Sequence, residues 1–200
     1  MKAALNTRQK TMVNLYPLIM KVTRWLGRNN LIRVNRNNTP PAKPIYDLAV
    51  TLNNGQQLPL RELQGKKILL VNTASNCGYT GQYAELQQLQ NEYKESLVVI
   101  GFPANDFKEQ EKGNDESIAQ FCQVNFGVSF PLARKSSVVA GPQQNSIYQW
   151  LTQPAQNGWN SQAPEWNFSK YLVNDRGALT HYFGPSVAPL GPELKSSLQA

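Results

Sequence analysis

The sequence predicts an α/β protein whose strands form one sheet of mixed direction. Two short apolar runs, at 67–72 and 97–102, have the length and the flanking turn residues of buried strands. A segment with helical spacing of apolar residues follows each of them, at 80–94 and 115–126. Near the C-terminus, two strand patterns flank the turn sequence at 174–177, which predicts an antiparallel pair. This order of elements is typical of an α/β sheet with helices packed against it.

Residues 11–34 carry an amphipathic helical pattern that Pro17 and Gly27 interrupt, so a long helix is not the expectation. Because the segment is basic and amphipathic, it predicts either peripheral contact with an anionic membrane surface or a transit peptide. A solvated, poorly ordered tail is the plain alternative. Residues 35–44 have the composition of a linker. The apolar positions of the pattern are Met12, Leu15, Tyr16, Ile19, Val22 and Leu26.

We expect a compact domain at 45–200, preceded by a basic extension and linker at 1–44. A β-hairpin begins the domain, with strands at 45–52 and 57–60 on either side of an Asn-Asn-Gly turn. Asn114 is the expected N-cap of the helix at 115–126, whose first turn is acidic. The remaining expected elements are helices at 145–151 and from 192 onward, and strands at 171–173 and 179–183.

The positive charge of the chain is concentrated at its N-terminus. The net charge is +7, but residues 1–46 hold nine Lys and Arg and no acid, whereas the rest of the chain holds 11 basic and 13 acidic residues. A body with this balance does not favour nucleic-acid binding. No apolar run approaches the ~20 residues of a membrane span. The expected location is therefore the cytoplasm, with membrane-surface association or organelle targeting by residues 1–40 as alternatives.

Cys77 is the first candidate for chemistry, because it follows a central strand and precedes a helix. The carboxyl ends of such strands are where α/β sheets place their sites, and a helix N-terminus lowers the pKa of a thiol. Position 80 is Thr, so there is no Cys-x-x-Cys pair, and a single attacking thiolate is favoured over dithiol exchange. An inert buried cysteine is the alternative. Cys122 has the periodicity of a core residue of its helix, and His181 is expected to be structural or exposed.

Four blocks of the sequence, in order, resemble the glutathione peroxidase family. Residues 72–80 (NTASNCGYT) resemble the signature around its redox-active residue, and 101–113 (GFPANDFKEQEKG) resemble the segment with its active-site glutamine. Residues 121–131 (FCQVNFGVSFP) resemble the block that follows, and 165–168 (EWNF) the block with its Trp and Asn. The resemblance runs from about residue 45 to residue 192. The chain departs from the family pattern at Ala104, Asp106 and Lys112.

The resemblance implies a thioredoxin-like fold and reduction of hydrogen peroxide and of organic or lipid hydroperoxides. Cys77 takes the position of the peroxide-attacking residue, and Gln110, Trp166 and Asn167 complete a tetrad around it. Cys122 takes the position of the resolving cysteine in members that thioredoxin reduces. No metal or organic cofactor is implied. The short connection at 141–165 resembles members without an added oligomerisation loop, so we expect a monomer.

Three alternative functions remain open from the sequence. Glutathione, rather than thioredoxin, could reduce the enzyme directly, although Cys122 disfavours this version. A peroxide sensor or relay would pass its disulfide from Cys77 to a partner protein and would use the same residues. A catalytically silent thioredoxin-like binding module is disfavoured because all four residue types of the tetrad are retained.

Overall fold

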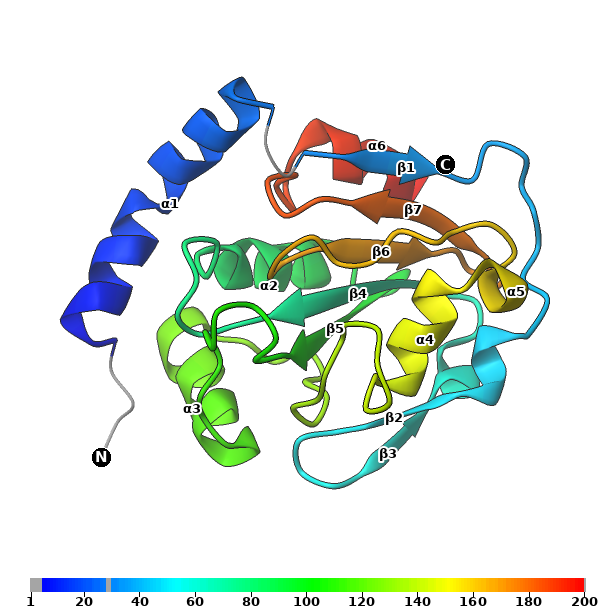
Figure 1. The fold of residues 1–200 in the computed structure, drawn as a ribbon, viewed down its shortest axis with the longest axis horizontal. Helices are drawn as coiled ribbons and strands as arrows, with labels where there is room; N and C mark the ends of the chain where they lie inside the picture. Colours follow the sequence, from blue (N-terminus) through cyan, green and yellow to red (C-terminus); the bar gives the residue numbers. More distant parts are fainter. Residues whose placement is uncertain (1–4, 28–29, 200) are drawn as a thin grey trace.

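The computed structural model describes residues 5–27 and 30–199, and its centre is a five-stranded sheet in the order β1-β7-β6-β4-β5 (Figure 1). β4 and β5 are parallel, whereas β4–β6, β6–β7 and β1–β7 are antiparallel pairs. The mixed sheet that the sequence predicted is thus confirmed. Its strands are β1 (Ile32–Val34), β4 (Lys67–Thr73), β5 (Leu97–Pro103), β6 (Lys170–Val173) and β7 (Leu179–Phe183).

Alternate residues of β4 supply two separate cores. Ile68 and Leu70 belong to one buried cluster, and Leu69 and Val71 belong to the other. A strand buried on both faces reads as a continuous apolar run, which is why this strand was predictable. The helices α2 (Gln82–Glu92), α3 (Asp115–Phe126) and α6 (Pro192–Gln199) pack with Leu69, and α4 (Ser146–Thr152) packs with Leu70.

The expected hairpin forms a separate two-stranded sheet, in which β2 (Ala49–Thr51) pairs with β3 (Gln57–Pro59). Short 3-10 helices flank it, η1 (Ile45–Asp47) and η2 (Leu60–Leu63). The N-cap of α3 is also as expected, because the Asn114 side chain accepts a hydrogen bond from Ser117 N–H. A short helix, α5 (Pro154–Asn157), was not anticipated.

The N-terminal segment differs from its sequence expectation. α1 (Thr7–Trp25) is a continuous helix that passes through Pro17 and ends before Gly27, which adopts a positive φ of 63°. β1 was not expected either, because a three-residue edge strand without alternating burial leaves no pattern. In Figure 1, α1 lies beyond the carboxyl end of β4, against the body of the molecule. Within the described residues, no helix combines the length and apolar character needed to cross a membrane.

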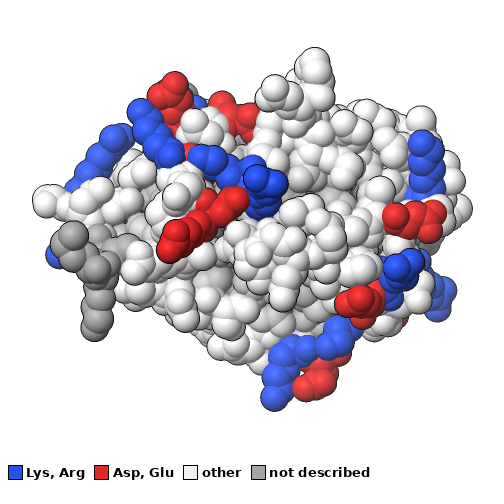
Figure 2. All heavy atoms as spheres, turned by 90° about the horizontal axis from the view of Figure 1, so that it is seen from below, with Lys and Arg blue, Asp and Glu red and all other residues white. Residues whose placement is uncertain are grey.

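On the face of the molecule seen in Figure 2, Lys and Arg side chains are interspersed with Asp and Glu side chains. This mixture agrees with the near balance of charge that the sequence shows after residue 46. A surface of this kind produces no extended field of one sign.

Candidate active site

Cys77 lies in the turn between β4 and α2 and is only 1% exposed. Thr80 fixes this turn, because its hydroxyl donates to the Cys77 carbonyl oxygen (2.7 Å) and accepts from Cys77 N–H (3.1 Å). The backbone N–H of Tyr79 donates to the Cys77 sulfur (3.5 Å). The thiol is therefore held by its own loop in a place that water barely reaches.

The segment with Trp166 and Asn167 is fastened to the end of β4. The Asn72 side chain donates to the Trp166 carbonyl oxygen (3.0 Å), and Phe168 N–H donates to the Asn72 carbonyl oxygen (2.6 Å). Phe168 has a φ of 67°, a left-handed conformation that is unfavourable for an aromatic residue. The buried amine of Lys170 donates to the Phe168 carbonyl oxygen (2.8 Å) and so stabilises this turn.

Burial raises the pKa of the Cys77 thiol above its ordinary value. Donors on the Tyr79 backbone, the Trp166 and Asn167 side chains and the Gly78 backbone act in the opposite direction, because they stabilise the thiolate. The net direction differs from the lowered pKa that a position before a helix predicted. The reason is desolvation, which the sequence does not reveal, and α2 begins only at Gln82, five residues after the cysteine.

Gln110 joins the site through Asn167. The Asn167 amide donates to Oε1 of Gln110 (2.9 Å), and the Gln110 carbonyl oxygen accepts from Asn76 N–H (3.1 Å). The turn before Gln110 contains Lys108 and Glu109, both with a φ of 52°. Two successive non-glycine residues in this region store strain, which proteins tolerate mostly at functional sites.

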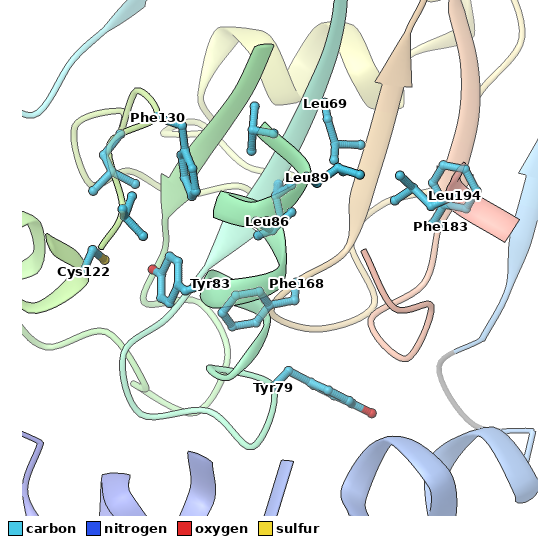
Figure 3. Packing of buried hydrophobic residues seen from close by; sticks show 14 of the residues in the cluster. Leu69, Tyr79, Tyr83, Leu86, Leu89, Cys122, Phe130, Phe168, Phe183 and Leu194 are labelled. Carbon is cyan, nitrogen blue, oxygen red and sulfur yellow. The ribbon is translucent and has the colours of Figure 1, made fainter. Parts of the chain in front are cut away.

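Cys122 lies inside α3, is fully buried, and is a free thiol like Cys77. Burial raises the pKa of the Cys122 thiol to about 12, with Tyr83 lowering it and Glu111 raising it further. Figure 3 shows Cys122 beside Tyr83 in the cluster that also holds Phe168. The resting structure thus places Cys122 in the core, as its periodicity predicted.

The family model for glutathione peroxidase matches residues 45–152. The chain belongs to the glutathione peroxidase family. The glutathione peroxidase-like peroxiredoxin GPX5 of Chlamydomonas reinhardtii is 40% identical over 158 residues, which cover 78% of this chain and 96% of that protein.

Solved structures agree with this family and with the thioredoxin-like fold. The crystal structure of T. cruzi GPX1 is similar with a TM-score of 0.59 and 28% identity, covering 78% of this chain and 95% of that one. A thioredoxin family thiol:disulfide interchange protein from Chlorobium tepidum is similar in fold, with a TM-score of 0.54, 14% identity and coverage of 80% and 97%.

Sequence reasoning missed one buried acid in this glutathione peroxidase family member. Glu111 is 1% exposed, and its carboxylate accepts from both the backbone N–H (2.8 Å) and the hydroxyl (3.0 Å) of Ser75. Burial raises the pKa of Glu111 to about 7, against the hydrogen bonds from Ser75. The sequence offered one signal for Glu111, its position next to Gln110. The stretch around it is polar, however, and predicts an exposed side chain. His181, in contrast, stacks on Phe183 in β7, as a structural residue does.

Proposed function

We propose that this member of the glutathione peroxidase family reduces hydrogen peroxide and organic or lipid hydroperoxides at Cys77. The observation that supports this most directly is the arrangement of donors around one sulfur atom. The side chains of Trp166 and Asn167 come from a segment about 90 residues further along the chain, and both act to lower the pKa of the Cys77 thiol. Gln110 orients the Asn167 amide from a third segment.

In the first step, the Cys77 sulfur attacks one oxygen of the hydroperoxide and the O–O bond breaks. The sulfur becomes a sulfenic acid, and the departing alkoxide takes up the proton that the thiol released, so the alcohol or water leaves neutral. The donors that lower the thiol pKa also face the charge that develops in this step. Preorganised donors of this kind contribute roughly 3 kcal/mol each to transition-state stabilisation.

In the second step, the Cys122 thiol attacks the sulfenic sulfur of Cys77, a disulfide forms, and the hydroxyl leaves as water. Cys122 is buried in α3, so the helix has to open locally before the two sulfurs meet. A dithiol reductant of the thioredoxin type then reduces the disulfide by exchange. One chain supplies all five proposed residues, so this scheme does not need a second copy of the protein.

A turnover assay with each reductant tests this function. The purified chain is given hydrogen peroxide or an organic hydroperoxide, with thioredoxin and its reductase or with glutathione as the electron source. We expect thioredoxin to sustain turnover and glutathione alone to sustain little. Equal turnover with glutathione would contradict the preference for a dithiol reductant, and no turnover with either would contradict peroxide reduction.

We also propose that α1 makes peripheral contact with anionic membranes. Its outward side carries apolar residues, and the segment before residue 47 has nine basic residues and no acid. Co-sedimentation with anionic vesicles tests this contact. The control is a variant without residues 1–26, which should no longer sediment with the vesicles.

A further inference from the structure

α1 is seated directly on the loop that carries Cys77. The Gln9 side chain donates to the Ser75 carbonyl oxygen (3.3 Å) and to Oδ1 of Asn76 (3.0 Å). These are the two residues that precede Cys77 in the chain. The N-terminal helix, which lies outside the family match at 45–152, thus bonds to the redox loop itself.

Two glycines of the same loop make room for the helix. A Cβ atom at Gly81 would lie 2.6 Å from Cγ of Tyr16, and one at Gly78 would lie 3.3 Å from Cδ1 of Ile19. Tyr16 is buried, and its hydroxyl donates to Oε1 of Glu85 on α2 (2.8 Å). The contact is therefore close along more than two turns of α1.

The same N-terminal segment also holds the helix of the second cysteine. Leu5 N–H donates to Oδ1 of Asn125 (3.2 Å), which lies one turn after Cys122 in α3. Residues 5–20 therefore contact both the Cys77 loop and α3. These two elements have to leave their resting positions before Cys77 and Cys122 can form a disulfide. Contacts made only in the resting state oppose that movement.

The opposite side of α1 exposes its apolar residues in the part of the chain that the structure describes. Leu18 is 57% exposed and Trp25 is 84% exposed. At 100° per residue, the exposed apolar positions form one stripe along the helix. Lys10 and Lys21 are exposed beside it. The members of this outer stripe are Leu15, Leu18, Val22 and Trp25 on α1, and Leu26 immediately after its end.

We propose that α1 is a latch on the redox site and that an anionic lipid bilayer is the partner that releases it. The proposal rests on the peroxide chemistry and membrane contact described above. A bilayer binds the released helix better than the seated helix, because release adds Ile19 and Met20, which pack on the protein core in the seated state, to the outer stripe. The bilayer and the redox loop therefore compete for the same helix, and membrane binding favours the state in which the disulfide forms.

The experiment measures vesicle binding and disulfide formation in the same samples. Full-length protein receives one equivalent of hydrogen peroxide, with vesicles of phosphatidylglycerol, with vesicles of phosphatidylcholine, or without vesicles. Loss of free thiols is followed in time, and binding is measured by co-sedimentation. We expect phosphatidylglycerol vesicles to bind the protein and to speed disulfide formation roughly fivefold or more, and phosphatidylcholine vesicles to do neither.

Matched variants separate the two sides of the helix. Gln9→Ala and Tyr16→Ala each remove contacts that hold α1 on the Cys77 loop and on α2. Each should therefore speed disulfide formation without vesicles. Leu18→Ser changes only the outer stripe, so it should weaken vesicle binding and reduce the vesicle effect to the same extent, while the vesicle-free rate stays the same.

Vesicle binding with an unchanged rate of disulfide formation would overturn the latch and leave the membrane contact standing. Absence of binding to phosphatidylglycerol would overturn the bilayer as partner. If no sample lost its thiols, the proposed peroxidase function would itself be wrong, and the latch with it.

Discussion

The Asn167 amide donates a hydrogen bond to Oε1 of Gln110 (2.9 Å), and this bond joins the segment before β6 to the loop after β5. Asn167 lowers the pKa of the Cys77 thiol, whereas Gln110 bonds to Asn167 and acts through it. Gln110→Ala should therefore lower the rate constant of Cys77 oxidation by about tenfold, the effect of one lost orienting hydrogen bond. Asn167→Ala should lower it by about 100-fold, because it removes a donor to the reacting sulfur. Stopped-flow oxidation measures both.

Gln88→Ala is the matched control, because Gln88 is an exposed glutamine whose side chain bonds to Glu92 on the same helix. Its oxidation rate should equal that of the wild type. If Gln110→Ala slowed oxidation as much as Asn167→Ala, Gln110 would itself contact the reacting atoms.

The pH dependence of Cys77 reactivity follows from its burial. Because burial raises the pKa of this thiol, the thiolate fraction increases with pH and reaches one half at a pH above the pKa of an ordinary cysteine. Alkylation by iodoacetamide should therefore still accelerate at mildly alkaline pH. Trp166→Phe removes a donor that lowers the pKa, so its midpoint should lie higher still. The measurement uses Cys122→Ser, so that only Cys77 reacts, and a midpoint below that of a free cysteine would refute it.

Glu111 should make the protein less stable as the pH rises from about 4.5 to about 7. Its pKa is raised from 4.5 to about 7 in the folded state, so between these values the folded protein retains a proton that the unfolded chain has lost. Stability therefore decreases with pH in this window, by roughly 3 kcal/mol in total. Glu111→Gln should remove that dependence and stabilise the protein at neutral pH. Denaturant unfolding at several pH values measures it, and parallel curves for both proteins would contradict the assignment.

Lys170 should be needed for the geometry of Asn167 as well as for stability. Burial lowers the pKa of Lys170 to about 7, and its amine donates to the Phe168 carbonyl oxygen. Lys170→Met keeps the volume but leaves that carbonyl without its partner, at a cost of about 2 kcal/mol in unfolding free energy. We expect Cys77 oxidation to slow about tenfold in folded Lys170→Met. Lys94→Met, at an exposed lysine, is the control, and an unchanged oxidation rate in Lys170→Met would limit Lys170 to stability.

Strands buried on both faces and a helix with a clear N-cap were readily predicted from the sequence. β4 and β5 are continuous apolar runs, and α3 begins at the residue that follows Asn114, as its capping sequence indicated. α1 was not predictable as a continuous helix, because its stability comes from tertiary contacts such as Tyr16 against Gly81 rather than from local propensity.

The candidate site was only partly predictable for a similar reason. The position of Cys77 after a strand identified it as a candidate, but Gln110, Trp166 and Asn167 were selected only by resemblance to the family. Their hydrogen bonds join segments far apart in sequence, and no local pattern reports such contacts. Glu111 was missed because it is buried against Ser75, a hydrogen-bond partner 36 residues away in the sequence.

The last prediction concerns Cys122, which is buried in the resting protein and is proposed to resolve the oxidised enzyme. Both hold if the first turns of α3 open after Cys77 is oxidised. That end of the helix follows the polar stretch at 108–114, and its cap is an exposed side chain, so local opening there costs little. Hydrogen exchange of α3 amides should therefore increase when wild-type protein is oxidised.

Cys122→Ser should still react once with peroxide, because the groups around Cys77 are unchanged, and the product should be a stable sulfenic acid that a dimedone-type reagent traps. It should not turn over with thioredoxin, because no Cys77–Cys122 disulfide can form. One equivalent of peroxide should remove both free thiols of the wild type and the only cysteine thiol of the variant. Cys77→Ser should still fold, and its remaining thiol, that of Cys122, should survive the same peroxide treatment. Full thioredoxin-dependent turnover by Cys122→Ser would show that Cys122 is a core residue and that the reductant attacks Cys77 directly.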